Sequence, residues 1–152
     1  KKEVFDEDLM AIVGDEIRVE GNEKFKLEYL HTISGSGTVP SATVRLHIEG
    51  AESVQQSAWG DGPVDASYEA INLAAGQRPT VEEYVIQAIT GGSQAMGEVT
   101  VRVNDGELKT TGRGVSTDII EASARAYVDA LNRLYLRRGR QVRSDQVQDQ
   151  TV

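Results

Sequence analysis

The same local pattern occurs twice along this 152-residue chain, and it restricts the folds that the chain can adopt. A Gly-x-Gly sequence is followed by an amphipathic helical segment at Gly60–Ala75 and again at Gly112–Leu134. Stretches of alternating apolar and polar residues precede both, as expected of antiparallel strands that bury one face. The sequence therefore predicts an α+β fold of two pseudo-symmetric βββα units, each an antiparallel sheet with one helix.

The first unit is expected to span residues 24–76. Strict alternation in its first strand places one set of side chains on a common face: Phe25, Leu27, Tyr29, His31 and Ile33. Pro63 suits the first turn of the following helix, because the N–H group that it lacks would have no partner there. Gly76 and Pro79 are expected to end that helix.

The second unit is expected to span residues 80–139. Its first strand, over 81–90, is apolar on both faces, so we expect it at the centre of a sheet or at an interface. Asn104-Asp105-Gly106 predicts a hairpin. In the final helix, Asp118 and Glu121 have capping-box spacing, and Arg137–Gly139 suits the C-terminus.

The two ends of the chain carry weaker patterns. Residues 1–18 are interpreted as the end of a linker or subdomain, with either a short helix or a solvated segment at 3–16. Residues 19–139 form the predicted domain. Residues 140–152 are polar and aperiodic, which predicts a disordered tail. Because the chain does not start with Met, we interpret it as part of a longer protein.

Composition excludes several classes of partner. The net charge is −8, with Asp and Glu spread along the chain, which argues against a nucleic-acid or anionic-membrane surface because such a surface requires clustered Lys and Arg. No apolar run reaches the length of a membrane span. The chain has no cysteine, which excludes disulfides and thiolate metal sites and fits a cytoplasmic protein.

No self-contained active site is expected from the sequence. The two histidines, His31 and His47, could pair across a hairpin, but a metal site needs further ligands at matching spacing. The common metalloprotease, hydrolase, phosphate-loop and thiol motifs do not occur. We therefore expect no catalytic residue, metal or cofactor in this chain.

The glycine turns are the remaining candidates for a binding site. A Gly-x-Gly turn that opens a helix exposes backbone N–H groups at the positive end of the helix dipole, where an anion or the carboxylate of a free amino acid can bind. A plain tight turn is the alternative. Asp65 and Asp118 are placed either to cap backbone or to accept hydrogen bonds from an ammonium group.

Two long sequence segments carry a resemblance to a known family. AWGDGPVDASYEAIN and GRGVSTDIIEASARAYVDALNRL resemble the C-terminal regulatory domain of 2-isopropylmalate synthase, which is shared with citramalate synthases. The resemblance covers about residues 20–138. It implies an isolated regulatory domain that forms a homodimer and binds L-leucine. It also implies a catalytic TIM barrel, outside this sequence, that uses a divalent metal to condense acetyl-CoA with 2-oxoisovalerate.

The resemblance also implies a set of leucine-binding residues. The turn N–H groups would hold the carboxylate, four apolar side chains would line the isobutyl pocket, and Tyr84 would form its wall. The implied residues are Gly60, Gly62, Pro63, Val64, Asp65, Val81, Tyr84, Ala88, Ala95 and Val115. Two alternatives stay open: an isoleucine-binding domain of a citramalate synthase, and a structural dimerisation domain without a ligand.

Overall fold

The computed structural model describes residues 23–89 and 95–150, with side chains described up to residue 145. The predictions for residues 1–18, including the helix at 3–16, lie outside the described residues. The elements follow in the order β1 (Phe25–Ile33), β2 (Ser41–Ile48), β3 (Val54–Trp59), α2 (Pro63–Ala75), β4 (Thr80–Ile89), β5 (Met96–Asn104), β6 (Lys109–Ser116) and α3 (Ile119–Gln150).

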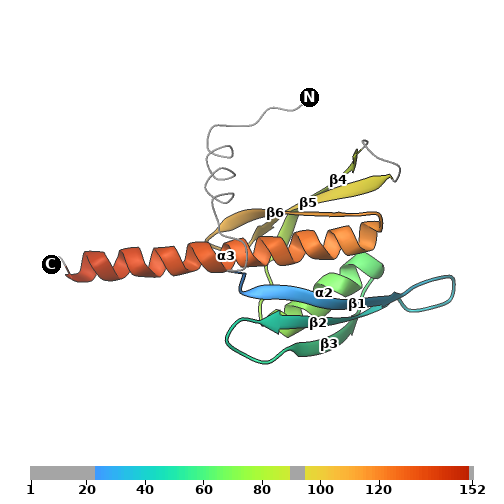
Figure 1. The fold of residues 1–152 in the computed structure, drawn as a ribbon, viewed down its shortest axis with the longest axis horizontal. Helices are drawn as coiled ribbons and strands as arrows, with labels where there is room; N and C mark the ends of the chain where they lie inside the picture. Colours follow the sequence, from blue (N-terminus) through green and yellow to red (C-terminus); the bar gives the residue numbers. More distant parts are fainter. Residues whose placement is uncertain (1–22, 90–94, 151–152) are drawn as a thin grey trace.

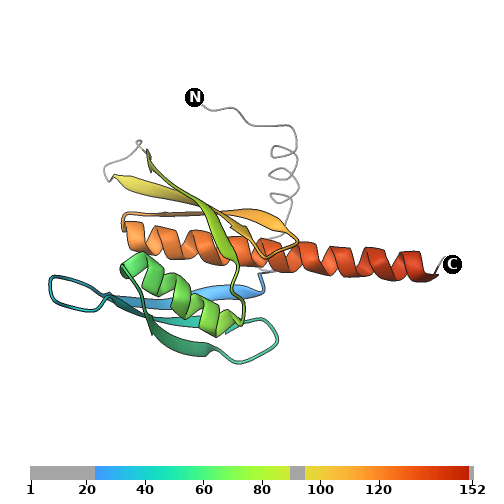
Figure 2. The ribbon, with the colours of Figure 1, turned by 180° about the vertical axis from the view of Figure 1, so that it is seen from behind.

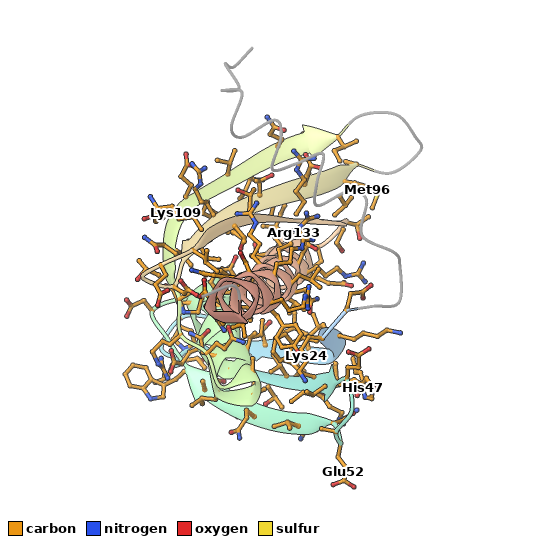
Figure 3. All side chains as sticks on the ribbon, turned by 90° about the vertical axis from the view of Figure 1, so that its left-hand side faces the viewer. Lys24, His47, Glu52, Met96, Lys109 and Arg133 are labelled. Carbon is orange, nitrogen blue, oxygen red and sulfur yellow. The ribbon has the colours of Figure 1, made fainter. Side chains whose placement is uncertain are left out.

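Two three-stranded sheets enclose the two helices (Figures 1 and 2). The sheets have the orders β1-β2-β3 and β4-β5-β6, and all four strand pairs are antiparallel. Helix α2 packs on the first sheet and α3 on β5 and β6, while the helices also touch each other. Figure 3 shows α3 end-on between the sheets. The prediction of two βββα units is confirmed.

The core lies where the helix layer meets the inner faces of the sheets. Val44 and Leu46 of β2 and Val99, Val101 and Val103 of β5 are fully buried. Ile71 of α2, with Leu131 and Leu134 of α3, fills the space between them. Burial of each such side chain stabilises the fold by about 1.5–3 kcal/mol. Both helices begin at the same end of the molecule (Figures 1 and 2).

The second Gly-x-Gly sequence does not form the predicted turn. Gly112 and Gly114 lie inside strand β6, on the face that α3 covers. A Cβ atom on Gly112 would lie 2.1 Å from the carbonyl oxygen of Ala126, and one on Gly114 would lie 2.2 Å from that of Ala122. These glycines therefore allow the backbones of β6 and α3 to touch, and the prediction that Gly112–Val115 forms a turn is wrong.

A β-bulge in β1 breaks the strict alternation that the sequence predicts. The register with β2 shifts between Leu27 and Tyr29, because Glu28 is an extra residue in the strand. Phe25, Leu27 and Leu30 consequently belong to the core, whereas Tyr29, His31 and Ile33 are exposed. Asn132 of α3 then binds the edge strand, accepting a hydrogen bond from the Phe25 N–H at 2.7 Å and donating one to its carbonyl at 2.9 Å.

Helix α3 continues through Gly139 to Gln150, so the predicted helix end and the disordered tail at 140–152 are not observed in its described part. A glycine inside a helix costs only about 1 kcal/mol, and no proline follows it before Gln150. Arg137 and Arg138 bind the β5–β6 hairpin instead of capping the helix end: they contact the Lys109 carbonyl and the Asp105 carboxylate, respectively, at 2.5 Å.

The predicted hairpin at Asn104-Asp105-Gly106 is confirmed. Gly106 has a positive φ of 106°, and its N–H donates to the Asn104 side chain at 2.8 Å. Burial opposes the charged form of Asp105, but the Leu108 N–H and the Arg138 guanidinium outweigh it, so the pKa of Asp105 falls to about 2. The hairpin is thus held to α3 by a charge-assisted contact.

Gly114→Ala is expected to destabilise the fold, whereas Gly139→Ala is expected to stabilise it. The new methyl group at 114 collides with the α3 backbone, and overpacking of this kind costs about 1–3 kcal/mol or more. At position 139 the nearest atom to an added Cβ is 3.8 Å away, and alanine favours the helix by up to about 1 kcal/mol. Urea unfolding followed by circular dichroism measures both changes. A stable Gly114→Ala variant would contradict the close β6–α3 contact.

Asp105 is expected to make stability depend on acid pH. Its pKa in the folded state lies below the ordinary value of 3.8, so its contribution is present above about pH 4 and is lost as the pH falls toward about 2. Asp105→Asn should lower the free energy of unfolding at neutral pH by about 1–2 kcal/mol and flatten its decline between those pH values. Glu107→Gln, on an exposed residue of the same loop, is the control and should leave the slope unchanged.

Candidate functional site

The first glycine turn has the form that the sequence predicts. Strand β3 ends at Trp59, and the Gly60 N–H donates to the Pro40 carbonyl at 3.1 Å. The chain then folds back on the first turn of α2 so closely that a Cβ atom on Gly60 would lie 2.7 Å from the Ala66 nitrogen. A glycine is therefore required at position 60 by close packing.

The beginning of α2 is open to a ligand. Gly62 is the N-cap residue in an extended conformation, Pro63 follows it, and no side-chain hydrogen bond caps the helix. The Val64 and Asp65 N–H groups belong to the first turn, where a helix provides no backbone acceptor. Together with the helix dipole, these groups favour a carboxylate or another anion.

A groove of about 540 Å³ lies between β3 and α2 beside this turn. Three of its lining residues, Asp61, Asp65 and Glu69, carry carboxylates, while exposed Trp59 and Leu73 offer apolar surface. The groove thus combines groups that bind a cation with groups that bind an apolar chain. Its lining residues are Ser57, Ala58, Trp59, Gly60, Asp61, Asp65, Glu69 and Leu73.

A cluster of tyrosines connects α2, α3 and β4 near the helix beginnings. The Tyr68 and Tyr127 rings stack with centroids 4.1 Å apart. The Tyr68 hydroxyl donates to the Ser123 carbonyl at 3.1 Å, and the Tyr127 hydroxyl donates to Asn72 Oδ1 at 2.6 Å. The Tyr84 and Ser123 hydroxyl oxygens lie 2.5 Å apart. We call Tyr68, Tyr84, Tyr127, Ser123 and Asn72 the tyrosine cluster.

The hydroxyl groups of Tyr68 and Tyr127 act as neutral hydrogen-bond donors. Burial is the main cause that raises the pKa of Tyr68 and raises that of Tyr127 to about 12. Ser123 donates its one hydrogen to the Ile119 carbonyl at 2.7 Å, so the Tyr84 hydroxyl is the donor in their shared bond. The cluster therefore attaches the exposed strand β4 to the helix layer at one point.

Tyr84 and Ala88 lie on the face of β4 that is directed toward the helices. Tyr84 pairs with buried Val101 and Ala88 with buried Gly97, and residues that pair directly share a face of the sheet. Val81 lies on this face too, because it pairs with buried Val103 and the bulge between Val81 and Glu83 shifts the alternation of side chains by one residue. Val81 and Ala88 are nevertheless about 20 Å apart along the strand, so within one copy of the chain no leucine side chain contacts both.

Ala95 and Val115 lie apart from Tyr84. Ala95 is exposed immediately before β5. Val115 pairs with Glu98 and alternates with buried Gly114 and Ser116, so its side chain is on the outer face of the second sheet. Tyr84 therefore lies near the beginnings of both helices, where Tyr68 of α2 and Tyr84 bind the same residue, Ser123 of α3. Val115 lies on the opposite face of the second sheet.

At the start of α3, the aspartate caps the helix. Asp118 Oδ1 accepts a hydrogen bond from the Ile120 N–H at 2.9 Å, and the Ser116 hydroxyl accepts one from the Asp118 N–H at 3.1 Å. Glu121 is bonded to Ser116 at 3.3 Å and forms an ion pair with Arg125. Capping is therefore the role of Asp118 that the geometry supports.

The histidines do not pair across the hairpin. His31 is opposite Thr43, whereas His47 is opposite Lys26. Among the described residues, no group of three or more His, Cys, Asp or Glu side chains is placed to hold a metal ion.

None of the helices in the described part of the chain is long and apolar enough to cross a membrane.

Sequence reasoning missed the partners that complete the site. Helical periodicity places Tyr68 on the apolar face of α2. Its hydroxyl partner Ser123 lies 55 residues away in the sequence, and no local pattern indicates that contact. Trp59 carried a weak signal, since it is the only tryptophan in the chain and comes directly before Gly60.

Comparison with known proteins assigns this arrangement to a family. The family model described as the LeuA allosteric (dimerisation) domain matches residues 3–135. The chain belongs to the LeuA allosteric (dimerisation) domain family. Members of this family that resemble it include regions of 2-isopropylmalate synthases from Carboxydothermus hydrogenoformans, at 51% identity over 135 residues, and Syntrophus aciditrophicus, at 47% over 135 residues.

The LeuA domain is only a part of these relatives. The alignments cover 88% of this chain but 26% of each of the two relatives. The 2-isopropylmalate synthase of Thermus thermophilus is 48% identical over 128 residues, which are 84% of this chain and 38% of that protein. The chain thus spans between about a quarter and two fifths of the length of the relatives it matches.

A double-mutant cycle is expected to detect the bond between β4 and α3 in the LeuA domain. Tyr84→Phe and Ser123→Ala should each lower the free energy of unfolding, and the coupling between them should be about 1 kcal/mol. Tyr29→Phe with Ser123→Ala is the control, because Tyr29 lies on the exposed face of β1, and its effects should add. Urea unfolding measures all variants. A coupling of zero for Tyr84 and Ser123 would show that the bond does not contribute.

Proposed function

We propose that the chain is the leucine-sensing regulatory domain of a 2-isopropylmalate synthase. The single observation that carries the proposal is the uncapped, glycine-bounded start of α2 beside Asp65, in a chain whose family is described as an allosteric domain. A free amino acid presents a carboxylate and an ammonium group a few ångströms apart. The α2 N–H groups suit the carboxylate, and Asp65 suits the ammonium group.

The side chain of the amino acid is proposed to extend toward the tyrosine cluster. Val64 is half-buried at the first turn of α2, and Tyr84 and Ala88 present the helix-facing side of β4. These residues would form the wall of an apolar pocket, with Gly60, Gly62 and Pro63 shaping the turn. The contacts proposed for Val81, Ala95 and Val115 stay predictions.

Regulation follows if leucine binds two arrangements of the domain with different affinity. A coupling free energy of about 1–3 kcal/mol between the regulatory and catalytic sites is typical of allosteric proteins. The proposed catalytic site belongs to a barrel that condenses acetyl-CoA with 2-oxoisovalerate. Its divalent metal would be bound in that barrel. The chain itself is proposed to be non-catalytic and to act in the cytoplasm.

The family's description as a dimerisation domain supports a homodimer. Two alternatives would be distinguished by titrating the chain with leucine, isoleucine and valine. An isoleucine-binding domain would have the same carboxylate and ammonium contacts and differ only in its pocket, where a displaced methyl group changes the binding free energy by about 1–3 kcal/mol. A structural dimerisation domain would bind none of the branched-chain amino acids.

Leucine is expected to bind the 152-residue chain and to raise its melting temperature. Isothermal titration calorimetry with leucine, isoleucine and valine measures affinity and specificity. Trp59 is the only tryptophan and borders the α2 turn, so its fluorescence gives a second, local signal. The absence of heat with all three amino acids would remove the sensing proposal, and a preference for isoleucine would move the chain to the citramalate synthase class.

Asp65→Asn is expected to weaken leucine binding by about tenfold or more, because a charge-assisted hydrogen bond to the ammonium group contributes about 1.5–3 kcal/mol. Glu52→Gln is the matched control. Glu52 lies in the β2–β3 loop at the outer side of the first sheet (Figure 3), and its change should leave the affinity unaltered. Equal affinities for the wild type and Asp65→Asn would assign the ammonium group to another partner.

A further inference from the structure

Strand β4 is the one strand, among the six described, in which every residue is exposed. It is also an edge strand, so one side of its backbone has no neighbour within the sheet. The prediction that this strand lies at the centre of a sheet is therefore wrong, and the interface alternative is left. Its large exposed apolar side chains are Val81, Tyr84, Val85, Ile86 and Ile89.

The exposure of β4 results from the position of α3. This helix covers β5 and β6, and it also reaches β1 of the first sheet, whereas the hydrogen bond that joins it to β4 is the one between Tyr84 and Ser123. Ile86 pairs with Val99, and Tyr84 pairs with Val101, both of which are buried under α3. The apolar inner face of the second sheet thus extends one strand beyond the helix that covers it.

The corresponding strand of the first unit, β1, contacts helix α3 through its backbone. Edge strand β1 places Phe25 in the core, and Asn132 of α3 binds both polar atoms of the Phe25 backbone. The repeat of the βββα pattern is therefore asymmetric: the domain's own helix α3 binds the backbone of β1 at Phe25, whereas every residue of β4 is exposed.

Strand β4 also lacks the features that prevent an edge strand from pairing with a strand of another molecule. Natural edges carry prolines, lysines or charged residues along their length, whereas the six residues Tyr84–Ile89 are uncharged. The two glutamates at its beginning are bound within the sheet, Glu82 to Asn104 at 2.9 Å and Glu83 to Arg102 at 3.6 Å. A long apolar edge of this kind adds another strand readily.

We propose that β4 pairs antiparallel with β4 of a second copy of the chain, joining the two β4-β5-β6 sheets into one. The family's description as a dimerisation domain identifies the occupant as a second copy. A two-fold axis normal to the sheet, centred on Val85 or Ile86, pairs the uncharged segment with itself and keeps Glu82 and Glu83 of the two copies apart. This inference rests on the homodimer and does not require a ligand.

The oligomeric state of the 152-residue chain tests whether β4 forms the dimer interface. Sedimentation without any amino acid should show a dimer for the wild type, and Ile86→Lys should raise its dissociation constant by about tenfold or more, since it places an ammonium group at the centre of the pairing. Val39→Lys is the matched control on another exposed apolar residue and should remain dimeric. A monomeric wild type, or an Ile86→Lys variant with unchanged dissociation, overturns the proposal.

Disulfide cross-linking tests the pairing itself. The chain contains no cysteine, so each single variant reports one position. A residue on the two-fold axis lies opposite its own copy, and Val85→Cys or Ile86→Cys should therefore form a covalent dimer on oxidation, whereas Val39→Cys should not. A dimer that cross-links at neither β4 position overturns the strand pairing, whatever the effect of Ile86→Lys. Because both tests omit leucine, their failure is distinct from a failure of the sensing proposal.

Discussion

The contact between the backbones of β6 and α3 is the constraint on which the rest of the domain depends. Gly112 and Gly114 let the helix lie directly on the strand, so the carbonyl groups of Ala122 and Ala126 approach to distances that any side chain on the strand would prevent. This close approach fixes the direction of α3. The same helix then reaches Phe25 through Asn132 and binds the hairpin through Arg138, and it leaves β4 uncovered.

The tyrosine cluster gives the ligand proposal and the dimer proposal a common physical basis. Tyr68 belongs to the second turn of α2, Tyr84 to the open strand, and both bind Ser123 of α3. A change at the start of α2 would therefore alter packing that also positions β4. This is spatial proximity with shared hydrogen bonds, and the double-mutant cycle measures how much energy the bonds carry.

The order of strands and helices could be predicted because each depends on local periodicity and turn chemistry, as in the Asn104-Asp105-Gly106 hairpin and the apolar stripe of α3. Two errors arose where one local pattern has two physical uses. Gly-x-Gly before a helix forms a turn at Gly60, but at Gly112 it permits close packing, and only the tertiary neighbour decides between them. Gly139 resembles a helix end, yet the helix continues because nothing follows that would terminate it. For the candidate site, the turn at Gly60–Asp65 was predictable from the sequence, but its proximity to Tyr84 required the fold.

The common direction of the two helices has an electrostatic consequence. Dipoles that lie side by side and point the same way repel each other, and their positive ends add to one local field at the end where both helices begin. Asp65 in the first turn of α2 and Glu121 in the first turn of α3 place negative charge within this field. In a chain of net charge −8, the positive ends of both helix dipoles therefore partly offset the negative charge at that end of the molecule.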